Sequence, residues 1–220
     1  MCAGERYLMV KKSRPVLCHD RGTVFVVSAP SGTGKTTLVK ALRRRFPFLE
    51  QSISCTTRRP RAGEKNGRDY HFLSRDEFER RVGEGYFFEW AEVYGNYYGT
   101  PKRELLDRIE KGRHVVCSID VQGALAVKRL VPQSAVLIFV IPPSLEELSR
   151  RITDRALDDP RVIERRLEEA KKEMRRYVHY DYIVVNDEIE RAVAVLASIV
   201  EVTLYASRRY RGELVERMIS

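Results

Sequence analysis

Residues 23–36 read Thr-Val-Phe-Val-Val-Ser-Ala-Pro-Ser-Gly-Thr-Gly-Lys-Thr, an apolar run that passes directly into a glycine-rich turn. A buried strand followed by a turn that ends in Gly34-Lys35-Thr36 is the pattern of a P-loop, which binds nucleotide phosphates. Gly32 and Gly34 allow the backbone to curl so that successive N–H groups point inward as a nest for an anion. Residues 37–42 predict a helix whose positive N-terminal end faces the same phosphates.

The side chains of this turn extend the prediction to a metal ion. Lys35 is long enough to reach the outer phosphates, and the Thr36 hydroxyl is suited to bind Mg²⁺ directly. The pattern usually begins with glycine, where this chain has Ala29; alanine fits when its φ is negative. A plain turn between a strand and a helix is the alternative, but the flanking elements favour phosphate binding. The residues expected at the phosphates are Ala29, Pro30, Ser31, Gly32, Thr33, Gly34, Lys35, Thr36 and Thr37.

The composition is that of an ordinary globular protein, and 220 residues suffice for one domain with insertions. No stretch approaches the ~18 consecutive apolar residues of a membrane span, so no membrane partner is expected. The net charge of +9 is spread along the chain, so nucleic acid is not a required partner. The scattered cysteines indicate free thiols in a reducing compartment, and we expect a cytoplasmic protein. Residues 1–21 are expected to form a flexible extension, followed by the folded domain at 22–220.

Strands and helices alternate through most of the chain. Besides the elements around the P-loop, strands are expected at 114–119, 135–141 and 182–185, and helices at 102–111, 121–130, from 144, at 160–177 and at 188–207. Such alternation predicts an α/β fold with a P-loop NTPase-type parallel sheet and helices on both faces.

Residues 53–99 interrupt this alternation. The segment is rich in strands and tyrosines, with strands expected at 51–55, 70–72, 86–93 and 97–98. The capping box Ser74-x-x-Glu77 predicts the start of a helix within it. We expect an insertion over the C-terminal edge of the parallel sheet, where α/β proteins bind ligands.

The insertion carries side chains suited to a second phosphate and to a purine base. Guanidinium and phenol groups donate hydrogen bonds to phosphate oxygens, and the candidates are Arg58, Arg61, Tyr70 and Tyr98. Ser54, Glu89 and Thr100 are polar groups near strand ends; a carboxylate can accept from N1–H and N2–H₂ of guanine while a hydroxyl donates to O6. Spacing alone also allows Glu89 to be the outward residue of an alternating strand, and the tyrosines to be packing residues.

Several segments together resemble the guanylate kinase family, in family order and at family spacing, from about residue 23 to residue 207. These segments are residues 28–37 (SAPSGTGKTT), 56–64 (TTRRPRAGE), 67–70 (GRDY), 89–91 (EWA), 95–100 (GNYYGT), 119–123 (IDVQG) and 185–187 (VND).

The resemblance implies a kinase that transfers a phosphoryl group from ATP to GMP, with dGMP as a further substrate and Mg²⁺ as cofactor. It also implies a nucleotide-binding core, a GMP-binding insertion at 53–99 and a helical lid at about 143–174. Lys35 and Thr36 would act on ATP and Mg²⁺, with Asn186 near the adenine. Asp120 would order magnesium-bound water or an arginine that binds the substrate, although it also suits a plain helix N-cap. The implied GMP ligands are Ser54, Arg58, Arg61, Tyr70, Glu89, Tyr98, Thr100 and Asp120.

The lid resemblance implies that Arg151, Arg155 and Arg166 stabilise the transferred phosphoryl group beside Lys35. A solvated, charged helix is the alternative for residues 161–176. The chain departs from the family pattern at two positions. Ser118 stands where an acidic residue is usual, and Asp154-Arg155-Ala156 replaces Gly-Arg-Gly in the lid. The loss of these glycines predicts slower lid opening or a hinge elsewhere.

Other functions remain as alternatives. One is an interaction module of guanylate-kinase type without catalysis, against which the intact Gly34-Lys35-Thr36 argues. Another is a monophosphate kinase for a different base, against which Ser54 and Glu89 argue. A regulatory GTPase is least favoured, because the chain has no N-K-x-D-type guanine motif. The sequence leaves the oligomeric state open.

Overall fold

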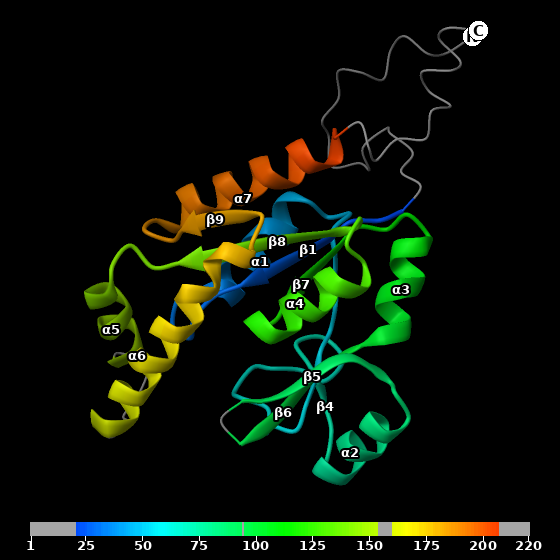
Figure 1. Cartoon of the computed structure of the whole chain (residues 1–220), viewed down its shortest axis with the longest axis horizontal. Helices are drawn as coiled ribbons and strands as arrows, with labels where there is room; N and C mark the ends of the chain where they lie inside the picture. The colour runs from blue at the N-terminus through cyan, green and yellow to red at the C-terminus, as the bar shows by residue number, and fades with distance from the viewer. Residues whose placement is uncertain (1–20, 94, 154–159, 207–220) are drawn as a thin grey trace, which may run out of the picture.

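The computed structural model describes residues 21–93, 95–153 and 160–206. Within these residues a five-stranded sheet has the strand order β2-β7-β1-β8-β9, and all of its strands run parallel (Figure 1). Its strands are β1 (Val24–Ser28), β2 (Glu50–Gln51), β7 (Val115–Ser118), β8 (Ala135–Ile141) and β9 (Tyr182–Val185). The predicted α/β fold with a parallel sheet is confirmed.

Helices cover both faces of this sheet because its strands are apolar on both sides. Phe25 and Val27 of β1 pack into the cluster formed with α1 and α7. Val24 and Val26 point the other way, into the cluster formed with α3 and α4. These helices are α1 (Lys35–Arg45), α3 (Lys102–Glu110), α4 (Val121–Leu130) and α7 (Ile189–Leu204). The strand that leads into the P-loop is therefore buried at the centre of the molecule.

A second sheet lies beside α3 and α4 (Figure 1). Its order is β4-β3-β6-β5, and Phe78 of α2 stacks on Phe87 at 4.3 Å between ring centroids. Ser74 caps α2 by accepting from the Glu77 N–H, as the capping box predicts. The elements are β3 (Cys55–Thr56), β4 (His71–Phe72), α2 (Arg75–Gly83), β5 (Phe87–Val93) and β6 (Asn96–Pro101).

The single strand expected at 51–55 is wrong. Glu50–Gln51 pairs with β7 in the parallel sheet, whereas Cys55–Thr56 pairs with β4 and β6 in the second sheet. The intervening residues 52–54 carry the chain from one sheet to the other. An apolar and polar pattern of this length cannot distinguish one strand from two short ones.

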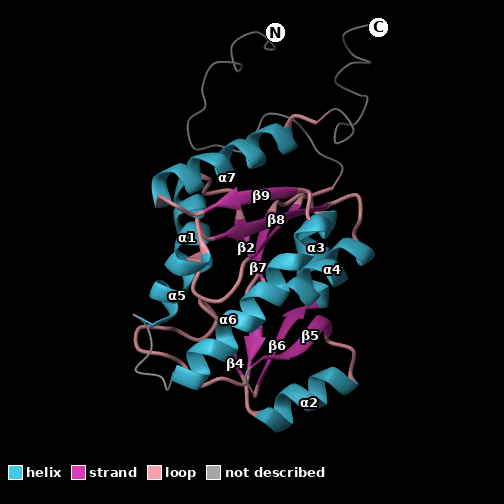
Figure 2. Cartoon of the chain, turned by 60° about the vertical axis from the view of Figure 1, so that its left-hand side comes forward, coloured by secondary structure: helices cyan, strands magenta, loops and turns pink. Residues whose placement is uncertain are grey.

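Two helices pack on each other beside the P-loop end of the sheet (Figure 2). These are α5 (Leu145–Thr153) and α6 (Pro160–Met174), which meet through Leu148, Ile152 and Ala170. The helix expected at 160–177 ends at Met174 and continues as the 3₁₀ turn η1 (Arg175–His179). Residues 1–20 of the expected N-terminal extension and Arg155 of the lid lie outside the described residues. No helix in the described part of the chain is long and apolar enough to cross a bilayer.

Candidate active site

The P-loop takes the conformation that its glycines predict. Gly32 has φ +88° and Gly34 has φ +93°, values that side-chain-bearing residues rarely adopt. The space around them is also restricted. A Cβ atom on Gly34 would lie 2.7 Å from Asn186 Nδ2, and one on Gly32 would lie 3.0 Å from Ile152 Cγ1. Helix α1 begins directly after Gly34 without a side-chain cap, so its first N–H groups are open to an anion.

The underside of the P-loop is held by a residue at the end of β9. Asn186 is buried, and its Nδ2 donates to the Thr33 carbonyl at 2.6 Å. The backbone carbonyl of Asn186 accepts from both terminal nitrogens of Arg151 at 3.2 Å, which ties α5 to the same point. The remaining polar atoms here, Asn186 Oδ1 and Thr33 Oγ1, are buried without a hydrogen-bond partner in the described structure. Unpaired buried polar atoms of this kind call for a hydrogen-bond partner.

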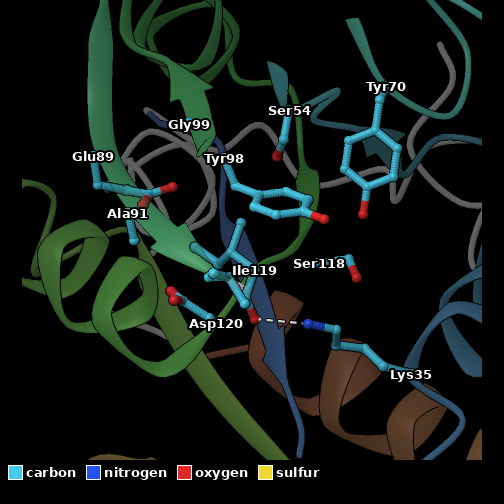
Figure 3. Close-up of a pocket in the computed structure, with 11 residues that line it drawn as sticks. Lys35, Ser54, Tyr70, Glu89, Ala91, Tyr98, Gly99, Ser118, Ile119 and Asp120 are labelled. Atoms are coloured by element: carbon cyan, nitrogen blue, oxygen red, sulfur yellow. Dashed lines mark hydrogen bonds between the residues drawn. The ribbon is translucent and has the colours of Figure 1, made fainter. Parts of the chain in front are cut away.

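Lys35 points from the first turn of α1 across the end of the sheet. Its Nζ donates to the Ile119 carbonyl at 3.0 Å, just after β7 (Figure 3). Burial lowers the pKa of Lys35, while the carboxylates of Asp120 and Glu173 act in the opposite direction. Asp120 caps α4, because its Oδ1 accepts from the Gly123 N–H at 2.8 Å. The N-cap interpretation of Asp120 is thus confirmed, and the same carboxylate also faces the cavity described next.

A cavity of about 150 Å³ opens between the two sheets (Figure 3). The parallel sheet and P-loop contribute Lys35, Ser118, Ile119 and Asp120, and the second sheet and the segment before it contribute Ser54, Tyr70, Glu89, Ala91, Val93, Tyr98 and Gly99. The expectation that the insertion lies over the C-terminal edge of the sheet agrees with this arrangement. The cavity joins the P-loop lysine to the carboxylate proposed for base recognition.

Glu89 projects into this cavity from β5. The Thr100 hydroxyl donates to its Oε1 at 2.6 Å across the β5–β6 pair. Burial raises the pKa of Glu89 to about 7, the Thr100 hydrogen bond lowers it, and the nearby Asp120 charge raises it further. A carboxylate withdrawn from water in this way has unused acceptor capacity for a ligand that carries N–H donors.

A preformed arginine site borders the cavity. Nη2 of Arg58 donates to both carboxylate oxygens of Glu64 at 2.9 Å, and the Arg58 side chain is only 15% exposed. The Arg61 N–H donates to the same carboxylate at 2.8 Å. The Arg58 guanidinium lies 5.5 Å from the centroid of the Tyr70 ring, and Tyr98 contacts it as well. Glu64 therefore fixes the arginine against the aromatic side chains.

The structure brings most of the sequence-predicted residues together. Lys35, Ser54, Tyr70, Glu89, Tyr98 and Asp120 line one cavity, and Thr100 and Arg58 contact members of that set. The Arg61 side chain is exposed, and Arg166 lies on α6 outside the cavity lining. Sequence reasoning gave no role to Glu64, Gly123 or Glu173. Glu64 and Gly123 belong to the segments 56–64 and 119–123, which carry the family resemblance, so this signal could have identified them. Nothing in the sequence distinguishes Glu173 from its charged neighbours.

A glycine-rich turn ending in Gly34-Lys35-Thr36 at the carboxyl end of a parallel sheet, next to a cavity lined by charged and hydroxyl side chains, is typical of a P-loop phosphotransferase. The family model described as "Guanylate kinase" matches residues 21–203. The chain is 47% identical to a guanylate kinase of Dechloromonas aromatica, covering 90% of this chain and 99% of that protein. It is 45% identical to one of Caulobacter vibrioides, covering 90% and 94%. The solved guanylate kinase of Anaplasma phagocytophilum superimposes with a TM-score of 0.74 at 36% identity, covering 90% and 95%. The chain therefore belongs to the guanylate kinase family and is a nucleotide-binding kinase.

Proposed function

We propose that this enzyme transfers the terminal phosphoryl group of ATP to GMP and to dGMP, with Mg²⁺, in the recycling of purine nucleotides in the cytoplasm. The observation that carries the proposal is the shared cavity, which is lined both by Glu89 and by Lys35 of the P-loop. One pocket suits a purine with N–H donors, and the adjoining turn suits a polyphosphate. As part of this proposal, we divide the chain into a nucleotide-binding core, a GMP-binding insertion at 53–99 and a lid at about 143–174.

Guanine recognition is assigned to Glu89, Ser54 and Thr100. The ionised Glu89 carboxylate accepts from guanine N1–H and N2–H₂, and the Ser54 hydroxyl donates to O6. Thr100 holds the carboxylate through its 2.6 Å hydrogen bond. Adenine presents no matching pair of donors, so it would leave the carboxylate buried and unpaired. None of these contacts needs the ribose 2′-hydroxyl, which is why dGMP is included.

The phosphate of GMP is assigned to Arg58, Arg61, Tyr70 and Tyr98. Guanidinium and phenol donors around one point bind an anion strongly because the hydrogen bonds are charge-assisted. Glu64 and the Tyr70 ring already restrict Arg58, so less conformational freedom is lost on binding.

ATP is assigned to the P-loop, residues 29–37, and to Asn186. The open N–H groups at the start of α1 suit the phosphates, and the orphaned Asn186 Oδ1 suits the exocyclic amine of adenine. Mg²⁺ prefers oxygen ligands, and the exposed Thr36 hydroxyl, next to Lys35 in the chain, and the Asp120 carboxylate of the cavity can supply them. We assign Thr36 as a direct ligand and Asp120 as a ligand through water. When bound, the ion would neutralise part of the phosphate charge.

Phosphoryl transfer here requires alignment rather than proton removal, because the attacking oxygen of GMP belongs to an anionic phosphate. The chain's task is to hold two anions in line and to stabilise charge on the moving group. Lys35 is placed for this by its position between the P-loop and Asp120. Arg151, Arg155 and Arg166 are assigned the same role after lid closure; of these, Arg151 is already tied to the P-loop region through Asn186.

The test is an ADP-release assay with ATP, Mg²⁺ and each of GMP, dGMP, AMP, CMP and UMP in turn. We expect turnover with GMP and dGMP and at least about 100-fold lower kcat/KM with the others, from the unpaired carboxylate that they leave. Preference for another monophosphate would reject the assignment of Glu89. Binding of GMP without turnover would instead support an interaction module.

A further inference from the structure

Gly123 lies in the first turn of α4 and faces the second sheet. Its N–H is already used by the Asp120 cap, so its backbone offers no donor to the cavity. Helix α4 packs against β5, the strand that carries Glu89. The neighbour that fills the space beside the Gly123 Cα is the carboxyl end of Glu89.

The distances show that this space is tight. A Cβ atom on Gly123 would lie 2.9 Å from Glu89 Cδ, 2.9 Å from Oε2 and 3.1 Å from Oε1. Outside the backbone of α4 itself, these are the three atoms nearest to that Cβ position, and all three belong to the Glu89 carboxyl group. A methyl group would therefore displace the end of one flexible side chain and leave the backbone in place.

We infer that Gly123 is a specificity-determining position of the acceptor pocket, because its missing side chain provides the place for the Glu89 carboxylate. This inference rests on the proposed function, in which Glu89 reads guanine. Thr100 holds one carboxylate oxygen from β6, and the bare Gly123 Cα borders the other side. Gly123 is a positioning residue: it acts on the base through Glu89 alone.

The test is Gly123→Ala, with Gly83→Ala as the matched control. Both glycines are helical, but a Cβ atom on Gly83 meets nothing within 4 Å. Alanine is the better helix former, so G123A is expected to fold. We expect its KM for GMP to rise about tenfold or more, since hydrogen bonds to a charged group are lost. Its KM for ATP should stay within twofold of the parent.

Inosine monophosphate lacks the 2-amino group of guanine, so the ratio of kcat/KM for GMP to that for inosine monophosphate reports the contact between Glu89 and this group. A general structural defect would lower both values and leave the ratio unchanged. Displacement of Glu89 should reduce the ratio of kcat/KM for GMP to that for inosine monophosphate, and G83A should keep it. An unchanged ratio in G123A, or a uniform loss of kcat, would overturn the inference while the proposed function stands. A parent enzyme inactive with GMP would overturn the proposed function itself.

A double variant covers the case in which G123A does not fold. Glu89→Ala removes the obstructing carboxylate, so E89A/G123A should fold where G123A alone fails. If the double variant also fails to fold, the obstruction does not come from Glu89 and the inference is wrong. If both fold, G123A should add little to the defect of E89A, because neighbours that act together are not additive.

Discussion

Lys35 is the cation that the fold places between the P-loop and the end of β7. Its buried ammonium group has a carbonyl partner and two carboxylates in its surroundings, yet burial still lowers its pKa. We expect this cation to exchange its protein contacts for phosphate oxygens when a nucleotide binds.

Lys35→Ala is expected to reduce kcat by at least about 100-fold, the size of effect seen when one donor to transition-state charge is removed. The fold should survive, because the change removes a group that is costly to bury. Steady-state ADP release together with circular dichroism checks both parts. The control is Lys40→Ala, which removes an exposed lysine of the same helix. Near-normal turnover of K35A would contradict the role assigned to Lys35.

Glu89 predicts a pH dependence for the use of GMP. With a pKa of about 7 in the free enzyme, Glu89 is protonated below that pH and has lost acceptor capacity for guanine. The kcat/KM for GMP should therefore fall as pH drops below about 7, approaching tenfold per pH unit. The GMP phosphate also titrates, near pH 6, so Glu89→Gln serves as the reference. A parent profile that coincides with the E89Q profile would remove Glu89 from base recognition.

The same carboxyl group predicts an effect on stability. Its pKa is raised from 4.5 in an unperturbed glutamate to about 7 in the folded enzyme, so the folded state retains a proton that the unfolded state has lost. The contribution of Glu89 to the free energy of unfolding therefore decreases as pH rises from about 4.5 to about 7. Glu89→Gln should unfold at a higher urea concentration than the parent at pH 8, with little difference at pH 5. The reverse order at pH 8 would contradict the pKa direction.

At the scale of elements, the P-loop is held from beneath as well as shaped by its own glycines. Asn186 follows β9, Arg151 comes from α5, and the two meet under Thr33. Residues separated by more than 150 positions in the chain thus fix one turn.

Asn186→Ala is expected to raise the KM for ATP and to lower the free energy of unfolding by about 1–3 kcal/mol, because it leaves the buried Thr33 carbonyl unpaired. The KM for GMP should change little. ATP kinetics and urea unfolding check the two effects. The control is Asn66→Ala, which removes an exposed side-chain contact to the Phe72 N–H and should leave the KM for ATP unchanged. Equal KM values for ATP in N186A and the parent would sink this proposal.

At the scale of the whole molecule, the two sheets border one cavity, and beside it Phe88 of β5 packs against the apolar cluster under α3 and α4. The second sheet has its own small cluster of Cys55, Phe78 and Phe87, separate from the clusters of the parallel sheet. Bound substrates should therefore add contacts across the cavity between the two sheets.

Binding of either substrate should stabilise the protein by mass action. At a concentration of about 100 times Kd the gain is about 2.7 kcal/mol, which for a domain of this size raises Tm by about 5–10 °C. Differential scanning fluorimetry with GMP alone and with ATP and Mg²⁺ alone measures each pocket separately. UMP is the control ligand. A shift with UMP as large as that with GMP would show that the acceptor pocket does not read guanine.

The sequence by itself determined the α/β alternation, the P-loop and the identity of most polar residues of the cavity. The first two follow from local physics: buried strands are apolar on both faces, and a phosphate-binding turn needs glycines at fixed positions next to Lys35. The polar residues of the cavity were predicted through the resemblance to the guanylate kinase family, because spacing alone left Glu89 and the tyrosines open to other roles. Residues 51–55 show the limit of such reasoning, because strand pairing depends on partners far along the chain.

Only the tertiary structure decided which way Glu89 faces, since an alternating strand fits both an exposed and a buried carboxylate. Packing of α4 against β5 places Glu89 beside Gly123, and withdrawal from water then sets its pKa. The support of the P-loop by Asn186 and of Arg58 by Glu64 was likewise decided by folding. Hydrogen bonds and desolvation depend on distances in space, and the order of residues along a chain does not contain those distances.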